Sequence, residues 1–93
     1  MIVSFRCKHT EMLWRSGKSK RLPPPILKVA LRKLWLLDNA TDLQDLKAPP
    51  SNRLESLCGD RKDQYSIRIN NQWRICFVWE NQMAHEVEIV DYH

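Results

Sequence analysis

The sequence predicts an α+β fold in which helices pack on one face of a small, mainly antiparallel sheet. In the first half of the chain apolar residues recur at the helical period, and in the second half they alternate with polar residues as in strands. The resulting order, an N-terminal strand, two helices and then three or four strands, is typical of this fold class. With only 93 residues, positions 1–93 are expected to form a single domain.

The N-terminal part is expected to hold one strand and two helices. An apolar run at residues 2–5 suits a strand, and the apolar cluster within residues 10–16 suits a short helix that ends at Gly17. The longest helix should begin near Pro24 or Pro25, because proline lacks the N–H that has no partner in the first turn of a helix. Five apolar residues then recur at the helical period: Leu27, Ala30, Leu31, Leu34 and Leu37.

Period-two alternation predicts strands at residues 65–69 and 73–79. Asn70 and Asn71 between them are expected to form a tight hairpin turn, since asparagine tolerates positive φ better than most residues. The remaining elements are expected, in chain order, as a helix end at residues 38–41, a helical turn at 42–46, a loop at 49–52, one more strand at 54–57, a turn at 80–82 and a last strand at 87–90.

The cysteines and the short apolar runs restrict the compartment. Three cysteines without a C-x-x-C pair argue against a disulfide framework and a zinc ribbon, and they suggest free thiols in a reducing, cytoplasmic environment. We expect no membrane span and no signal peptide, because no run is long enough and the start lacks the required layout. The three histidines and Cys7 lack a recognised metal-ligand spacing, so no metal or other cofactor is expected.

The charge is distributed unevenly along the chain. Residues 1–37 hold nine Lys or Arg and one acid, whereas residues 38–93 hold six and ten, so that regional charges of +8 and −4 make up the net charge of +4. A one-sided basic segment favours a polyanionic partner such as a nucleic acid. The alternative is a solvated surface that keeps the protein soluble.

Two arginines on the predicted strands are candidate ligand contacts. Arg68 and Arg74 occupy polar positions of the alternating pattern, so we expect them on the uncovered face of the sheet, near one another across the hairpin. The alternative is that they form cross-strand ion pairs with Glu86 and Glu88.

The last three residues combine a carboxylate, a phenol and an imidazole. Metal-free RNA cleavage needs a base for the ribose 2′-OH, cations for the phosphate and an acid for the leaving 5′-oxygen, and DNA lacks this nucleophile. His93 suits the acid because histidine titrates near neutral pH, Asp91 suits a base or a partner that orients His93, and Tyr92 suits stacking on a base. The alternative is that three ionisable residues at a terminus are incidental.

Several motifs together resemble the HigB toxins of the RelE-like superfamily, over nearly the whole chain. They are I-V-S-F at residues 2–5, R-L-E-S-L-x-G-D-R at 53–61, Y-S-I-R at 65–68, W-R-I at 73–75 and the terminal D-Y-H. The resemblance implies a RelE-like fold and a toxin that cuts mRNA in the decoding site of the translating ribosome, without a cofactor. It also implies a helix-turn-helix, HigA-like antitoxin encoded beside the toxin.

The resemblance also implies roles for individual residues. The catalytic residues are Asp91, Tyr92 and His93, with Glu55 as a further candidate. The RNA or phosphate contacts are Arg61, Lys62, Arg68 and Arg74. Glu55 stands where some members place a histidine, and Cys58 where a lysine occurs in relatives. Because glutamate can act as a base but supplies no cation, this toxin is expected either to be slower or to divide the catalytic roles differently.

The resemblance gives the basic segment a second interpretation, as a surface that faces ribosomal RNA. Contacts of this kind neutralise phosphates and need no sequence readout. Solubility remains the alternative. The predicted ribosome-facing patch comprises Lys18, Lys20, Arg21, Lys28, Arg32 and Lys33.

Two other functions stay open at the level of sequence. A RelE-like toxin of the ParE branch inhibits DNA gyrase and needs no nuclease residues, so the terminal D-Y-H argues against it. A non-catalytic RNA- or DNA-binding module would use the basic half of the chain and leave Asp91 idle. Substitution of His93 separates these possibilities, because only a nuclease depends on it.

Overall fold

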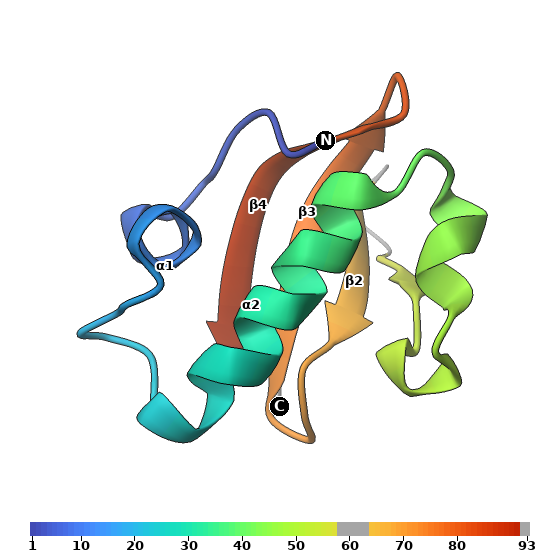
Figure 1. The fold of residues 1–93 in the computed structure, drawn as a ribbon. Coiled ribbons are helices and arrows are strands. Elements are labelled where there is room, and N and C mark those ends of the chain that lie inside the picture. The colour runs from blue at the N-terminus through green and yellow to red at the C-terminus, as the bar shows by residue number, and fades with distance from the viewer. Residues whose placement is uncertain (58–63, 92–93) are drawn as a thin grey trace.

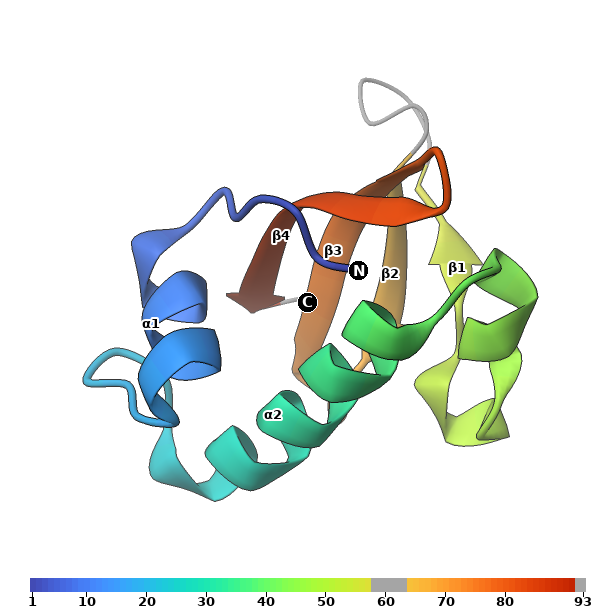
Figure 2. The ribbon, with the colours of Figure 1, turned by 45° about the horizontal axis from the view of Figure 1, so that its top comes forward.

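Four antiparallel strands form one sheet, and the helices lie on one of its faces (Figures 1 and 2). The structure, a computed structural model, describes residues 1–57 and 64–91. The sheet order is β1-β2-β3-β4, so the predicted α+β fold with an antiparallel sheet is confirmed. The elements are α1 (Lys8–Ser16), α2 (Pro24–Asn39), the 3-10 helices η1 (Leu43–Lys47) and η2 (Pro50–Asn52), and the strands β1 (Glu55–Ser56), β2 (Gln64–Arg68), β3 (Trp73–Glu80) and β4 (Met83–Asp91).

Both predicted helices are present. α1 begins at Lys8, two residues before its predicted start, and it ends where Gly17 adopts a φ of 75° and donates its N–H to Leu13 O at 2.8 Å. Glycine suits this left-handed position because it has no Cβ. α2 begins at Pro24, as predicted, and buries most of the apolar face that its periodicity indicated.

Residues 2–5 do not form the predicted strand. They pair with β4 only through two isolated parallel bridges, at Ile2 and Phe5. Between these bridges β4 bulges, with Glu86 at a φ of 51° and a shift in its register with β3. The bulge interrupts the regular row of backbone groups along this edge, so a continuous ladder cannot form.

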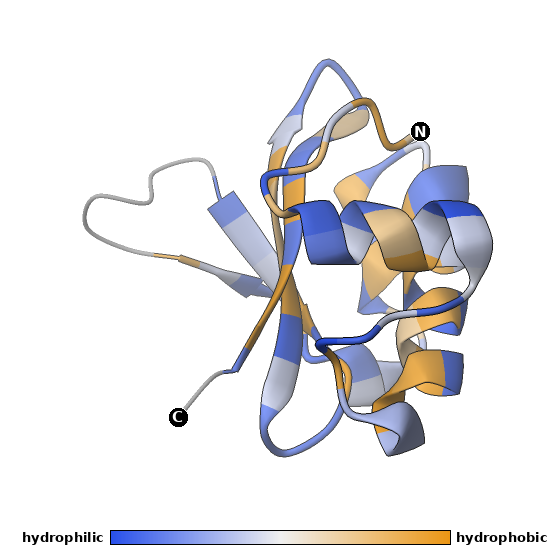
Figure 3. Ribbon diagram, turned by 90° about the vertical axis from the view of Figure 1, so that its left-hand side faces the viewer, coloured by the Kyte–Doolittle hydropathy of each residue, from blue (hydrophilic) through white to orange (hydrophobic). Residues whose placement is uncertain are grey.

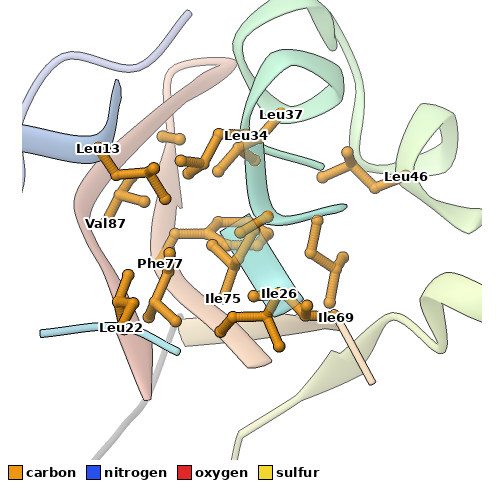
Figure 4. Close-up of a cluster of buried hydrophobic side chains, with 14 of the residues drawn as sticks. Leu13, Leu22, Ile26, Leu34, Leu37, Leu46, Ile69, Ile75, Phe77 and Val87 are labelled. Carbon is orange, nitrogen blue, oxygen red and sulfur yellow. The ribbon is translucent and has the colours of Figure 1, made fainter. Parts of the chain in front are cut away.

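An apolar cluster fills the space between the helices and the sheet (Figure 4). Leu13 from α1, Leu34 and Leu37 from α2, and Ile75 and Phe77 from β3 are almost completely buried. Figure 3 shows the sheet edge-on, with both helices on the same side of it. Burial of each such side chain contributes about 1.5–3 kcal/mol, and this layer determines which face of the sheet the helices cover.

Of the two predicted hairpin turns, one is wrong and one is confirmed. The predicted tight turn at residues 70–71 is wrong, because residues 69–72 join β2 to β3 and Asn70 Oδ1 accepts hydrogen bonds from two following N–H groups, both at 2.8 Å. The asparagine therefore acts through its side chain and not through a positive φ. The turn predicted at residues 80–82 is confirmed: Asn81 and Gln82 form a two-residue turn between β3 and β4, with the φ values of 54° and 62° that type I′ turns require.

The remaining elements follow the predictions with small differences. The helical turn expected at residues 42–46 is η1, and the expected additional strand is the two-residue β1. The loop predicted at residues 49–52 contains η2, and β4 begins at Met83, four residues before its predicted start. Within residues 1–57 and 64–91, no helix has the length and apolar character needed to cross a membrane.

Candidate functional site

The face of the sheet opposite the helices brings together residues from three neighbouring strands. Residues paired directly across antiparallel strands point to the same face. The register pairs Arg68 with Arg74, and it pairs Ser66 with both Glu55 and Cys76. Glu55, Arg68 and Arg74 therefore share the uncovered face, and the prediction that the two arginines lie side by side across the hairpin is confirmed.

Arg74 is held in place by two contacts. Its side chain is 9% exposed, Nη2 donates to Arg53 O at 2.6 Å, and Nη1 lies 3.7 Å from Glu55 Oε1. The Glu55 side chain is half exposed, so its carboxylate stays accessible from the solvent. A guanidinium held by fixed neighbours is preorganised for an incoming anion, because little reorganisation is needed when the anion binds.

A polar hollow of about 260 Å³ lies beside this arginine pair. It is lined by three arginines and two asparagines, and Arg68 Nη2 donates to Asn71 Oδ1 at its border. Among the described residues no acidic side chain lines it, so its electrostatic character is cationic. Guanidinium groups match the geometry of phosphate oxygens. We call this hollow the arginine pocket, defined by Arg53, Arg68, Asn70, Asn71 and Arg74.

Asp91 lies at the same end of the sheet as the arginine pocket. It pairs with Trp73 at the start of β3, and its Oδ2 accepts a hydrogen bond from Gln72 Nε2 at 3.0 Å. Gln72 belongs to the same loop, residues 69–72, that contributes the asparagines of the pocket. Strand alternation directs the Asp91 side chain to the face opposite that of Arg74. Asp91 is therefore linked to the arginine pocket through the loop of residues 69–72.

Four of the predicted site residues lie outside the described part of the chain: Arg61, Lys62, Tyr92 and His93. The geometry above therefore concerns Glu55, Arg68, Arg74 and Asp91.

The alternative of direct cross-strand ion pairs with the glutamates of β4 is wrong. Arg68 is on β2, which β3 separates from β4. Arg74 is paired with Val90, whereas Glu88 is paired with Cys76. Among the described residues, Arg74 forms an ion pair with Glu55 on β1.

Five of the six cations of the predicted basic patch are exposed. Three precede α2, and two lie on it: Lys18, Lys20, Arg21, Lys28 and Arg32. We call these five residues the basic patch. They are spread over residues 18–32, in the segment before α2 and on α2 itself.

Lys33 was predicted to belong to this surface, and that prediction is wrong. Its residue is 8% exposed, and its ammonium group donates to Oδ1 of the fully buried Asn52. Burial lowers the pKa of Lys33, and the charge of Arg32 lowers it further. Lys33 therefore links α2 to η2 and offers little to a surface partner.

Two features of the site were missed by the sequence interpretation. Arg53 lines the arginine pocket and its carbonyl holds Arg74, but it was seen only as part of a motif. Its φ of 44° and its position after η2 come from tertiary packing and leave no periodic signal. Asn70 and Asn71 were interpreted as turn residues, although the polarity of both side chains was visible.

The described residues offer no metal site. No group of three or more His, Cys, Asp or Glu side chains in residues 1–57 and 64–91 is arranged so that it could hold a metal ion.

Solved structures of another toxin share this fold. Two complexes of YoeB with YefM from Staphylococcus aureus, one described as a heterotetrameric toxin–antitoxin complex, match the whole chain and 98% of theirs. The TM-scores are 0.60 and 0.56, and the sequence identity is 14% in both cases. At this identity the likeness concerns the fold, which is the RelE-like one.

Sequence comparisons are more specific. Residues 3–93 match the family of HigB-like toxins, described as the RelE-like toxin of the type II toxin–antitoxin system HigB. The chain is 41% identical over 85 residues to Toxin HigB-1 of Vibrio cholerae, with 90% of each chain covered. It is 31% identical over 93 residues to Endoribonuclease HigB of Proteus vulgaris, with both chains covered completely. The chain therefore belongs to the HigB-like family of RelE-like toxins from type II toxin–antitoxin systems.

Proposed function

We propose that this HigB-like toxin is a ribosome-dependent mRNA endoribonuclease that inhibits translation by cutting translated mRNA. The observation that carries the proposal is the arginine pocket, in which Arg53, Arg68 and Arg74 surround a hollow and Glu55 contacts one of them. A cationic hollow beside a carboxylate suits a phosphodiester next to a base. The relative named an endoribonuclease supports RNA as the substrate.

The reaction needs three transfers. A base removes the proton of a ribose 2′-OH, the 2′-oxygen bonds to the adjacent phosphorus, and the bond from phosphorus to the next 5′-oxygen breaks. Negative charge grows on the phosphate oxygens during this exchange, so Arg68 and Arg74 stabilise the transition state more than the ground state. An acid protonates the leaving 5′-oxygen. These steps proceed through protein side chains alone.

We assign proton transfer to Glu55 and an orienting role to Asp91. Glu55 is half exposed and contacts Arg74, which supports a role in taking a proton from a nucleotide whose phosphate is in the pocket. Asp91 is held by Gln72 and is suited to orient the residues that follow it. The family resemblance adds the acid His93, the stacking residue Tyr92 and the phosphate contacts Arg61 and Lys62.

A substitution pair tests the role of Glu55. Glu55→Gln removes the base and should lower the cleavage rate by about 10²-fold or more, whereas Glu55→His supplies a base again and should recover part of it. Glu88→Gln is the matched control. Glu88 lies on the same face of the sheet, but its cross-strand partner is Cys76 and not Arg74. If Glu55→Gln cleaves as fast as the control, Glu55 is not the base.

The ribosome and an antitoxin are the proposed partners. The basic patch is proposed to meet the phosphates of ribosomal RNA, since exposed lysines and arginines bind polyanions without sequence readout. A helix-turn-helix, HigA-like antitoxin is proposed to block the toxin. Both interactions would take place in the cytoplasm.

The proposal is tested by brief expression of the wild-type chain and of His93→Gln, untagged at the C-terminus. Transcript 5′ ends are mapped with and without a block of translation. New ends inside coding regions that require both His93 and translation are the expected result. Growth arrest without such ends would point to gyrase, and RNA binding without either would point to a non-catalytic module.

A further inference from the structure

A second, larger hollow lies next to the arginine pocket. It has a volume of about 640 Å³ and is bordered by α2, by the segment around η2 and by the end of β2. We call it the tryptophan groove, and the residues that matter here are Arg32, Trp35, Leu36, Pro49, Arg68 and Asn70. In Figure 2, α2 crosses below the sheet, and η2 and β1 follow beside it.

Trp35 is the unusual residue of this groove. It is 58% exposed, whereas Trp14, Trp73 and Trp79 pack against the core. An exposed indole ring offers a flat surface on which a nucleotide base can stack. Arg32 precedes Trp35 by three residues on the same helix, so the two side chains are neighbours on its surface.

The groove continues directly from the arginine pocket. Arg68 and Asn70 line both hollows, so a ligand that fills one can extend into the other. Among the described residues every charged side chain that lines the groove is a cation: Arg32, Lys33 and Arg68. Because Lys33 donates to Asn52, the cations that face a ligand are the two arginines.

We propose that the tryptophan groove is a second nucleotide subsite, in which Trp35 stacks on a base of the single-stranded RNA whose phosphate occupies the arginine pocket. Arg32 and Arg68 neutralise the phosphates on either side of that base. The inference rests on the proposed function, which assigns a phosphate to the arginine pocket. Exposed aromatics within a cationic groove are how single-stranded nucleic acids are bound without strict sequence preference.

Charge and continuity favour RNA over a protein segment as the occupant. An apolar segment of a protein partner would match Leu36 and Pro49, but it would leave Arg32 and Arg68 without anionic partners unless it carried acids at matching positions. A polynucleotide supplies a phosphate at every step. It also explains why the groove opens into a pocket suited to phosphate.

The test measures the affinity of the purified full-length chain for two synthetic RNAs. A 2′-O-methyl oligoadenylate hexamer cannot be cleaved, because its 2′-oxygen carries no proton, and it is long enough to reach both hollows. A 2′-O-methyl adenylate dinucleotide has one phosphate and serves as the short probe. The variants are Trp35→Ala, Trp35→Phe and Arg32→Gln, and the controls are Met12→Ala and Arg15→Gln, which alter exposed residues of α1.

Trp35→Ala should weaken hexamer binding about tenfold or more, whereas Trp35→Phe keeps a stacking ring and should bind nearly as well as the wild type. Arg32→Gln should reduce the slope of log affinity against log salt by about 0.7, the value for one lost phosphate contact on a single strand. The dinucleotide carries a base next to its single phosphate, so Trp35→Ala should weaken its binding as well. Arg32→Gln should leave dinucleotide binding unchanged, because the second phosphate that Arg32 neutralises is absent. Circular dichroism verifies that each variant is folded.

An unchanged hexamer affinity in Trp35→Ala would overturn the inference. So would a Trp35→Ala variant that keeps its RNA affinity but loses the co-expressed antitoxin, because the groove would then be a protein site. Failure of the proposed function looks different. In that case the hexamer still binds through Trp35, but no mRNA is cut on ribosomes.

Discussion

Replacement of Asn52 by alanine is expected to lower the free energy of unfolding by about 3.5–5 kcal/mol. The side chain is fully buried, and its Nδ2 donates to the carbonyls of Leu46 and Ala48, both at 3.1 Å. Its Oδ1 accepts from the buried ammonium group of Lys33. Two neutral hydrogen bonds contribute about 1 kcal/mol each, and loss of the partner of a buried cation adds about 1.5–3 kcal/mol.

Urea unfolding at pH 7 measures this loss. With an m-value of about 1 kcal/mol/M for a small domain, the midpoint should fall by about 3 M or more. Asn39→Ala is the matched control, because Asn39 is an exposed asparagine whose side chain donates to the carbonyl of Trp35, and it should lose at most about 1 kcal/mol. If Asn52→Ala loses no more than Asn39→Ala, the buried network does not stabilise the fold and the reasoning is refuted.

A double-mutant cycle isolates the interaction with the lysine. Lys33→Met removes the buried charge, so adding Asn52→Ala to it no longer leaves an ammonium group without a partner. Asn52→Ala should therefore lower the free energy of unfolding by at least about 1 kcal/mol less in the Lys33→Met background than in the wild type. Equal effects in both backgrounds would mean that the two side chains do not interact.

Three further predictions concern titration and charge. Burial lowers the pKa of Lys33, so at alkaline pH the unfolded chain binds more protons than the folded one. The free energy of unfolding should therefore rise with pH between the folded pKa and the ordinary value of 10.5. The urea midpoints of Lys33→Met should lack this rise. Hydrogen bonds from the backbone N–H groups of Thr41 and Asp42 lower the pKa of Asp45. The stabilisation by Asp45 is therefore present above the ordinary aspartate pKa and is lost as the pH falls through the folded pKa. In urea unfolding, Asp45→Asn should lose less stability on acidification than the wild type. Reversing the charges of Lys18, Lys20 and Arg21 together should weaken co-sedimentation with ribosomes and reduce its salt dependence, and unchanged co-sedimentation across salt would contradict a role of the patch in ribosome binding.

Much of the fold could be predicted from local patterns. The apolar period of α2 and the proline at its start are local signals, and the alternation along β2 and β3 is equally direct. The predictions that were wrong concern segments whose conformation depends on tertiary contacts. The pairing of residues 2–5 depends on a bulge in β4, and the form of the β2–β3 connection depends on the side chain of Asn70 bonding to its own loop.

The candidate site was predicted in part for the same reason. Arg68 and Arg74 come from one hairpin, so alternation alone brings them together. Arg53 joins them from a segment that the sequence interpretation treated as a loop, and Lys33 is removed from the surface by Asn52, which is 19 residues away in the chain. Contacts between segments that lack periodicity leave no local pattern, so neither was visible before the structure.

The arginine pocket as the site of the scissile phosphate is tested most directly by single-turnover cleavage of a defined mRNA on purified ribosomes. The rates of Arg74→Gln and Arg68→Gln are compared with the wild type and with Arg15→Gln, an exposed arginine on α1 that pairs with Glu11. Each pocket variant should cleave about 10²–10³-fold more slowly, as expected when one donor to a transition-state anion is lost, while Arg15→Gln cleaves at the wild-type rate. Wild-type rates in folded Arg68→Gln and Arg74→Gln would contradict the account.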